Sequence, residues 1–211
     1  MKIGIIGAGQ VGGALARGWI AGGHEIRFGV RNQAKPELRE LLREFGPRAG
    51  AGTVAEAAAD AEVLVLSTPW NGTREAIESA GNLAGRIVVD CTNPLKADLS
   101  GLSVGLETSG AELVAQWARG ARVVKCFNTT GAENMADSAY AQGQPMMPVA
   151  GDDAAARQQV LALATLIGFD AVDMGPLSAA RYLEPLAMVW LHLAFRQGQG
   201  RRFAFARMTR A

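Results

Sequence analysis

A glycine-rich hexapeptide near the start of the chain has the spacing of a phosphate-binding loop. It reads Gly7-Ala8-Gly9-Gln10-Val11-Gly12, and it follows an apolar run and opens a segment of helical periodicity, which is the context that this pattern requires. Gly7 permits a tight turn, Gly9 lets the backbone approach a pyrophosphate, and Gly12 lets helix and strand pack closely. The N–H groups around Gln10 and Val11 would then bind the anion. The alternative is a glycine-rich turn without a ligand.

The end of the second expected strand indicates which dinucleotide would bind. Proteins that bind NAD usually place an acid there, against the ribose 2′-hydroxyl. No acid occurs between Ile26 and Pro36. The stretch carries these candidate cofactor contacts: Val30, Arg31, Asn32 and Lys35. Because a guanidinium can bind a 2′-phosphate bidentately, the sequence favours NADP(H). The alternative is that the two cations are an ordinary solvated surface pair.

Three expected strands end in small hydroxyl or amide side chains together with proline or an aromatic residue. Ligands of open α/β sheets lie at the carboxyl ends of the strands, so these segments are expected to line one cleft. The candidate cofactor contacts are Thr68, Pro69, Trp70, Asn93 and Pro94, and the candidate substrate contacts are Asn128 and Thr129. The alternative is that such residues serve only as turn and helix-cap residues.

The remaining reactive side chains form no recognisable catalytic set. Asp90 is expected to be a buried hydrogen-bond acceptor, and Cys91 and Cys126 are expected to be buried thiols, with a redox pair as the alternative. Trp190 and His192 are candidate substrate contacts. The alternative for His192 is a structural role, and the alternative for Trp190 is burial against the domain or in a homodimer. No cluster of metal ligands is apparent. Hydride transfer between nicotinamide and an acceptor would therefore proceed by positioning, without a catalytic side chain.

The elements that must position these residues alternate between strand and helix. Continuous apolar runs are typical of strands buried on both faces of a parallel sheet. The expected strands are 3–6, 25–29, 63–66, 87–89, 123–124 and 170–174, and the expected helices are 11–19, 33–45, 53–60, 152–168 and 178–195, the last interrupted by Pro185. This alternation predicts an α/β Rossmann fold with a doubly wound, mostly parallel sheet and a short C-terminal helical extension.

Composition sets the limits of the functional classes. The chain has 211 residues, 49% apolar and 19% charged, with a net charge of +1, which predicts a globular cytoplasmic protein that binds neither nucleic acid nor membrane. We expect a dinucleotide-binding domain over 1–175 and a C-terminal segment over 176–211. That segment holds six arginines and one acid, Glu184. Its arginines could form a cationic patch for an anionic substrate or contact nucleic acid, and the alternative is a tail packed on the domain or on a second subunit. Its apolar stripe is expected to pack on the domain or in a homodimer.

Several motifs together resemble the family of NADPH-dependent reductases of the deazaflavin coenzyme F420, which includes the reductase domain of six-transmembrane metalloreductases. The matching stretches are 22–26, 29–31, 68–70, 90–95, 123–129, 151–153 and 175–181. The resemblance implies a homodimeric Rossmann protein with Arg31 on the 2′-phosphate, Pro69 and Trp70 near the cofactor, and residues 128–130 near the nicotinamide. Val30 departs from the serine that relatives often have there.

The expected function is hydride transfer between NADPH and a flavin-like acceptor, with coenzyme F420 as the first candidate. One alternative is a reductase of another acceptor, such as an imine, a free flavin or a ferric chelate. A second alternative is a non-catalytic NADP-binding module that senses redox state or binds a partner.

Overall fold

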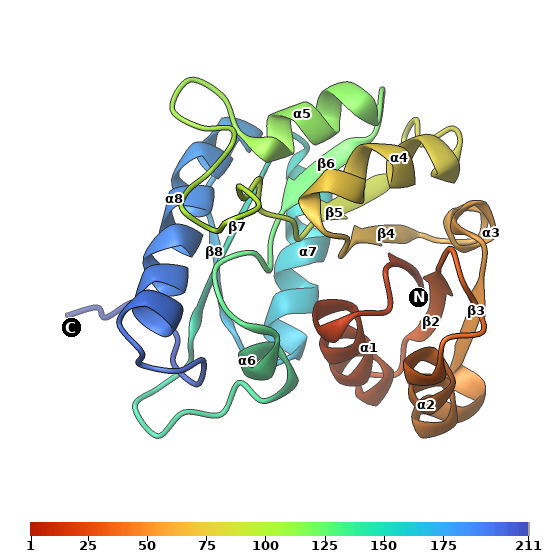
Figure 1. Cartoon of the computed structure of the whole chain (residues 1–211), viewed down its shortest axis with the longest axis horizontal. Helices are drawn as coiled ribbons and strands as arrows, with labels where there is room; N and C mark the ends of the chain where they lie inside the picture. The colour runs from red at the N-terminus through yellow and green to blue at the C-terminus, as the bar shows by residue number, and fades with distance from the viewer. Residues whose placement is uncertain (211) are drawn as a thin grey trace.

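The computed structural model describes residues 1–210 and is built on one eight-stranded sheet (Figure 1). The strand order is β3-β2-β1-β4-β5-β6-β7-β8. Neighbouring strands in the run β3-β2-β1-β4-β5-β6 are parallel, and β7 is antiparallel to β6. The strands are β1 (Lys2–Ile6), β2 (Glu25–Gly29), β3 (Ala49–Gly52), β4 (Val63–Leu66), β5 (Ile87–Asp90), β6 (Arg122–Lys125), β7 (Met146–Gly151) and β8 (Asp170–Asp173). The predicted doubly wound, mostly parallel fold is confirmed.

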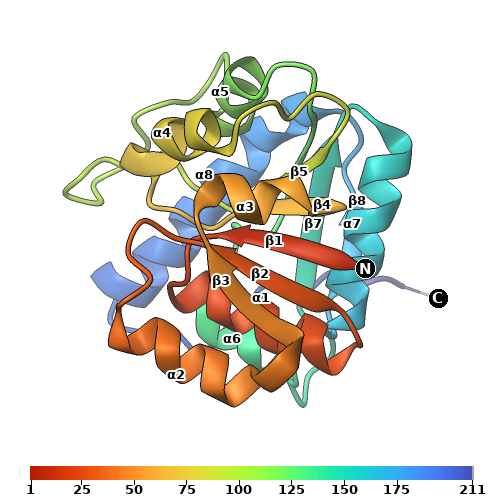
Figure 2. The same ribbon diagram turned by 90° about the vertical axis from the view of Figure 1, so that its right-hand side faces the viewer.

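Helices cover both faces of the sheet, and the central strands β4 and β5 are buried along their whole length. The helices are α1 (Gln10–Ala21), α2 (Pro36–Phe45), α3 (Val54–Ala59), α4 (Trp70–Ala80), α5 (Gly110–Trp117), α6 (Ala132–Ala136), α7 (Ala154–Leu166) and α8 (Ala180–Leu191). One core forms between the sheet and α1, α2, α6 and α7, and a second forms between the sheet and α3, α4 and α5. Figure 2 shows α3 on one side of β1 and β2, and α1 and α2 on the other.

Some boundaries differ from those that the sequence predicts. The second helix begins at Pro36 rather than at Gln33, because the residue before a proline is disfavoured in helical conformation. Pro185 lies inside α8 without interrupting it, and the helix continues from Leu191 into a π turn over His192–Arg196. The strands β3 and β7 and the helices α4, α5 and α6 were not predicted. The glycine-rich β3 in particular lacks a run of bulky apolar residues.

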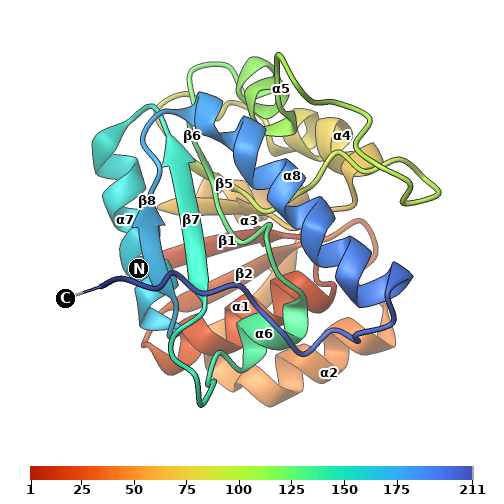
Figure 3. The same ribbon diagram turned by 90° about the vertical axis from the view of Figure 1, so that its left-hand side faces the viewer.

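The C-terminal segment runs along the outside of the sheet and crosses α6 toward β7 (Figure 3). The backbone N–H of Met146 donates to the carbonyl of Phe205 at 2.8 Å, so the tail extends the hydrogen bonding of β7.

Tyr182 and Val189 on α8 and the adjoining Phe195 are exposed apolar residues. The homodimer and the division at residue 175 stay predictions. Within residues 1–210, none of the helices has the length and apolar character of a membrane span.

Candidate functional site

The glycine loop joins β1 to α1 at the carboxyl edge of the sheet, and its three glycines have different constraints. Gly7 has a positive φ of 106°, and a Cβ there would lie 2.9 Å from the carbonyl oxygen of Ser67. A Cβ on Gly12 would overlap the carbonyl oxygen of Gly7. A Cβ on Gly9 would meet no atom within 4 Å. Gly7 and Gly12 are therefore required by the fold, whereas Gly9 faces open space that a ligand could fill.

The N-terminus of α1 has the properties of an anion site. Gly9 is the N-cap residue and offers no side chain to the helix, and the first turn contains no acid. The N–H groups at this end are therefore available to a ligand together with the positive end of the helix dipole. Gln10 and Val11 are the first two residues of α1, with Gln10 exposed and Val11 partly buried. This arrangement fits the pyrophosphate of a dinucleotide.

The segment after β2 presents cations and no carboxylate. The side chain of Arg31 is 85% exposed, and its Nη1 lies 3.9 Å from Glu75 Oε2, a long contact that leaves the guanidinium free to move. Lys35 is exposed at the N-cap of α2. Asn32 accepts a hydrogen bond from the N–H of Ala34 at 2.9 Å, so its side chain stabilises the local turn. The partly buried Val30 donates its N–H to Gly52 at 3.0 Å.

A cleft of about 380 Å³ opens beside the glycine loop, at the carboxyl ends of β1, β4 and β5. Thirteen residues line it: Val11, Ser67, Thr68, Pro69, Trp70, Asn71, Cys91, Thr92, Asn93, Leu95, Lys96, Ala97 and Leu99. Of the five predicted contacts after β4 and β5, four line the cleft, and Pro94 instead packs near Gly110. Trp70 packs against Trp117 of α5 with a ring-centroid separation of 5.3 Å and the two rings tilted by 34°. A second hollow, of about 330 Å³, lies at the opposite ends of β1 and β2.

The loop after β6 lies against the loop after β5 but is not itself a lining segment of the cleft. Asn128 is 4% exposed, and its Nδ2 donates to Asn93 Oδ1 at 3.0 Å and to the carbonyl of Leu183 at 3.1 Å. Its Oδ1 is buried and has no hydrogen-bond partner among residues 1–210. Thr129 is buried, with its Oγ1 3.9 Å from the sulfur of Met147. Asn128 thus positions Asn93, and the substrate contacts predicted for this loop stay predictions.

The two candidates on the C-terminal segment lie away from the lining of the cleft. Trp190 is buried and donates its Nε1–H to the carbonyl of Phe203 at 2.8 Å, so its polar atom serves the packing of the tail. His192 is exposed, with its Nε2 3.1 Å from Gln197 Nε2. Burial against the domain, the alternative for Trp190, accounts for its contacts. A substrate role for either residue stays a prediction.

Three buried ionisable residues meet beneath the cleft. Lys125 Nζ lies 2.9 Å from Asp90 Oδ2 and 2.9 Å from Glu184 Oε1, and all three side chains are buried. Glu184 also accepts the N–H groups of Gly110 and Ala111, so the start of α5 offsets part of its charge. Burial opposes the ammonium form of Lys125, but the two carboxylates outweigh it and raise its pKa.

This group confirms that Asp90 is a buried acceptor, because it also accepts from the N–H and Oγ1 of Thr92. Sequence reasoning missed Lys125 and Glu184. The signal was a lysine that ends a buried strand and the single acid of the C-terminal segment. Burial raises the pKa of the Cys91 and Cys126 thiols, which favours the unreactive protonated form. Across residues 1–210, no set of three or more metal-ligating side chains is placed to hold an ion.

The fold, the glycine loop and the cleft at the carboxyl ends of the strands define a dinucleotide-binding oxidoreductase of the Rossmann class. The family described as coenzyme F420-dependent NADP oxidoreductase matches residues 2–94. A crystal structure from Arthrobacter sp. FB24, provisionally described as an F420-dependent NADP-reductase, is 33% identical, with 98% of this chain and 100% of that chain covered and a TM-score of 0.88. The chain therefore belongs to this family of NADP oxidoreductases.

More distant relatives are similar to this chain over only part of their own length. The metalloreductase STEAP3 of Rattus norvegicus is 27% identical over 192 residues, which is 89% of this chain and 36% of the relative. The chain thus spans about a third of the length of the curated relatives it matches. An imine reductase from Myxococcus stipitatus in complex with NADP+ is 18% identical, with a TM-score of 0.69 over 94% of this chain and 63% of that one.

Proposed function

We propose that this chain transfers hydride between NADPH and a flavin-like acceptor, with coenzyme F420 as the first candidate. The observation that carries the proposal is the cleft of about 380 Å³ directly beside the glycine loop, in which Lys96 is the one charged lining residue. Such a lining can position two flat rings, and hydride transfer between them requires no acid or base from the protein. The similarity to the Arthrobacter structure supports the same acceptor.

The residues present fit NADP(H), because Gly9 faces open space at the N-terminus of α1, and Val11 in the first turn of the same helix lines the cleft. The glycine loop would hold the pyrophosphate, and Arg31 and Lys35 would bind the 2′-phosphate. Thr68, Trp70 and Asn93 would orient the ribose and nicotinamide. When bound, the dinucleotide supplies a hydride at nicotinamide C4, and the protein has to hold donor and acceptor carbons about 3–3.5 Å apart.

Replacement of Arg31 tests the assignment of the 2′-phosphate. Arg31→Glu places a carboxylate beside that phosphate, so we expect the dissociation constant of NADPH to rise about 10–100-fold, as for loss of a charge-assisted hydrogen bond. The dissociation constant of NADH should change less than about threefold. Both constants can be measured by titration of the intrinsic nicotinamide fluorescence. Arg43→Glu, on the exposed surface of α2, is the matched control. Equal weakening of NADPH and NADH would remove Arg31 from the phosphate site.

The acceptor is tested by following NADPH oxidation with purified coenzyme F420, free FMN, a ferric chelate and a cyclic imine in parallel. We expect turnover with the deazaflavin to exceed turnover with each of the others by at least about tenfold, because hydride transfer between two stacked flat rings requires only positioning and no proton donor. Fast reduction of the imine, with a rate that falls as the pH rises, would contradict the proposal. Tight NADPH binding without turnover of any acceptor would favour the non-catalytic sensor.

A further inference from the structure

The C-terminal tail is held in place by several polar contacts rather than by apolar packing alone. The carbonyl oxygen of Phe203 accepts the Nε1–H of Trp190 at 2.8 Å and the Nδ2–H of Asn134 at 2.8 Å, and the Phe203 ring stacks on Trp190 at a centroid separation of 5.5 Å. Asn134 also donates to the carbonyl of Arg201 at 3.1 Å. The backbone around Arg201 is therefore fixed on α6 and α8.

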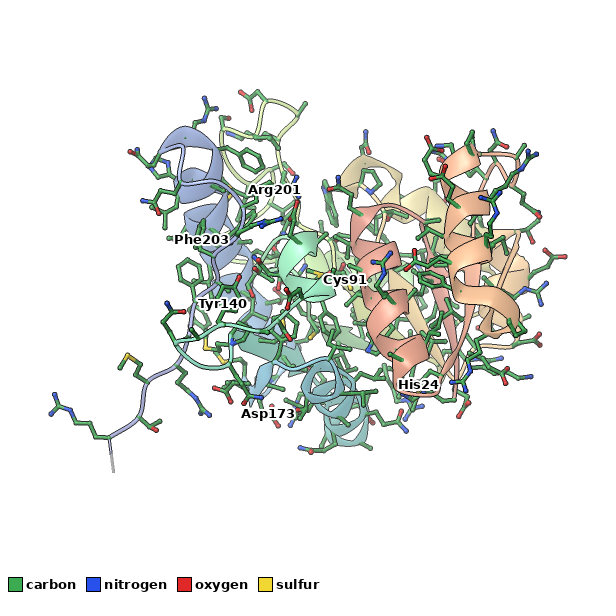
Figure 4. The ribbon with its side chains drawn as sticks, turned by 90° about the horizontal axis from the view of Figure 1, so that it is seen from below. His24, Cys91, Tyr140, Asp173, Arg201 and Phe203 are labelled. Carbon is green, nitrogen blue, oxygen red and sulfur yellow. The ribbon has the colours of Figure 1, made fainter. Side chains whose placement is uncertain are left out.

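This anchoring carries the side chain of Arg201 to the start of the glycine-loop helix. Its Nη2 lies 3.3 Å from Oε1 of Gln10, the first residue of α1, and 3.1 Å from Oε1 of Glu133 on α6. The guanidinium also lies over the ring of Phe195, 5.8 Å from its centroid. Figure 4 shows Arg201 on the inner side of the C-terminal segment, facing α6.

The pair of Arg201 and Glu133 is partly enclosed by the fold and partly open to solvent. Arg201 Nε and Glu133 Oε2 are both buried without a hydrogen-bond partner within residues 1–210. The two side chains are nevertheless 36% exposed, so they border solvent at the mouth of the loop. A guanidinium has five N–H donors in a planar fork, and here it is held beside a helix N-terminus that itself favours anions.

We propose that Arg201 is a second cationic residue of the proposed cofactor site, and that it binds an oxyanion at the mouth of the glycine loop. The oxyanion is either the pyrophosphate of NADP(H) or an acidic group on the acceptor bound next to it. Arg201 has two effects: it donates hydrogen bonds, and it neutralises Glu133, whose carboxylate would otherwise repel the anion. The C-terminal tail thereby contributes directly to ligand affinity. This inference rests on the proposed function, since it presupposes a dinucleotide at α1.

Three ligands separate the effect of Arg201 from that of Arg31. NADPH and 2′-phospho-ADP-ribose contain the pyrophosphate, whereas 2′-AMP carries the 2′-phosphate without it. We expect Arg201→Gln to raise the dissociation constants of the first two about tenfold in calorimetric titrations, and that of 2′-AMP less than twofold. Glu133→Gln should leave NADPH affinity unchanged or improve it, because it frees the guanidinium. Arg202→Gln, the exposed neighbour, should match the wild type.

The outcomes distinguish this inference from the proposed function. An unchanged dissociation constant for NADPH with an increased KM for coenzyme F420 in Arg201→Gln would support binding of the acceptor's acidic group. Unchanged constants for both ligands would overturn the inference. The inference would also be overturned if Arg201→Gln and Glu133→Gln weakened NADPH binding equally and lowered the Tm equally. That result would mean that the pair only holds the tail in place. A wild-type chain that binds neither NADPH nor 2′-phospho-ADP-ribose would instead overturn the proposed function, and this inference with it.

Discussion

Gly9→Ala is expected to weaken NADPH binding about 10–100-fold while the protein keeps its stability. A methyl group at this position meets no protein atom, so it enters the space through which the backbone would approach the pyrophosphate. The pyrophosphate would then lose charge-assisted hydrogen bonds from the loop, and this loss accounts for the expected weakening of about 10–100-fold. Gly9 has φ −85°, which alanine adopts readily, so the cost in free energy of unfolding is that of a weaker helix N-cap, below about 1 kcal/mol.

Gly12→Ala provides the contrast, because there the methyl group would overlap the carbonyl oxygen of Gly7 and crowd Ser67. We expect a loss of about 1–3 kcal/mol in the free energy of unfolding together with the loss of NADPH affinity. Gly50→Ala is the matched control, since its Cβ also enters open space but on β3, away from the cleft. Thermal melts measure the loss of stability, and NADPH titrations measure the loss of affinity. Wild-type affinity in Gly9→Ala would contradict a pyrophosphate at this loop.

The parts of the site that the sequence predicts are those defined by local rules. The spacing of Gly7, Gly9 and Gly12 between a strand and a helix determines the loop, and the structure adds only which glycine faces open space. Likewise, parallel strands buried on both faces appear in the sequence as continuous apolar runs, as in Val63–Leu66. The residues after such strands lie at one edge of the sheet, so Thr68 and Asn93 could be assigned to one cleft.

The parts that the sequence does not predict depend on contacts between distant segments. Buried Lys125 forms an ion pair with Glu184, which α8 places beside it, and no local sequence pattern links the two residues. Arg201 reaches Gln10 only because the tail turns back over α6. The edge strand β3 is formed by Ala49–Gly52, where alanine and glycine fit beneath neighbouring helices but carry no hydrophobic signal. In each case tertiary packing decides the outcome, rather than propensity.

Lys125→Met is expected to lower the free energy of unfolding by about 3–5 kcal/mol, as is typical when one partner of a buried ionic group is removed. Methionine preserves much of the volume, so the loss reports the charge rather than a cavity. The variant leaves Asp90 and Glu184 buried, with only hydrogen bonds to offset their charges, among them those from Thr92 and the start of α5. Urea denaturation at pH 8 measures the change. Lys2→Met, at an exposed position, should stay within about 0.5 kcal/mol of the wild type.

The pH dependence of this contribution follows from the raised pKa of Lys125. A lysine whose pKa in the folded state exceeds its ordinary value of 10.5 stabilises the fold fully below that pH, and the contribution is lost as the pH rises through the folded-state pKa. The unfolding free energies of the wild type and Lys125→Met should therefore converge only above about pH 10.5.

The double variant Lys125→Met, Glu184→Gln should recover part of the loss in unfolding free energy, because it removes one of the two uncompensated charges. A loss below about 1 kcal/mol in the single variant would mean that the α5 N–H groups compensate the carboxylates alone.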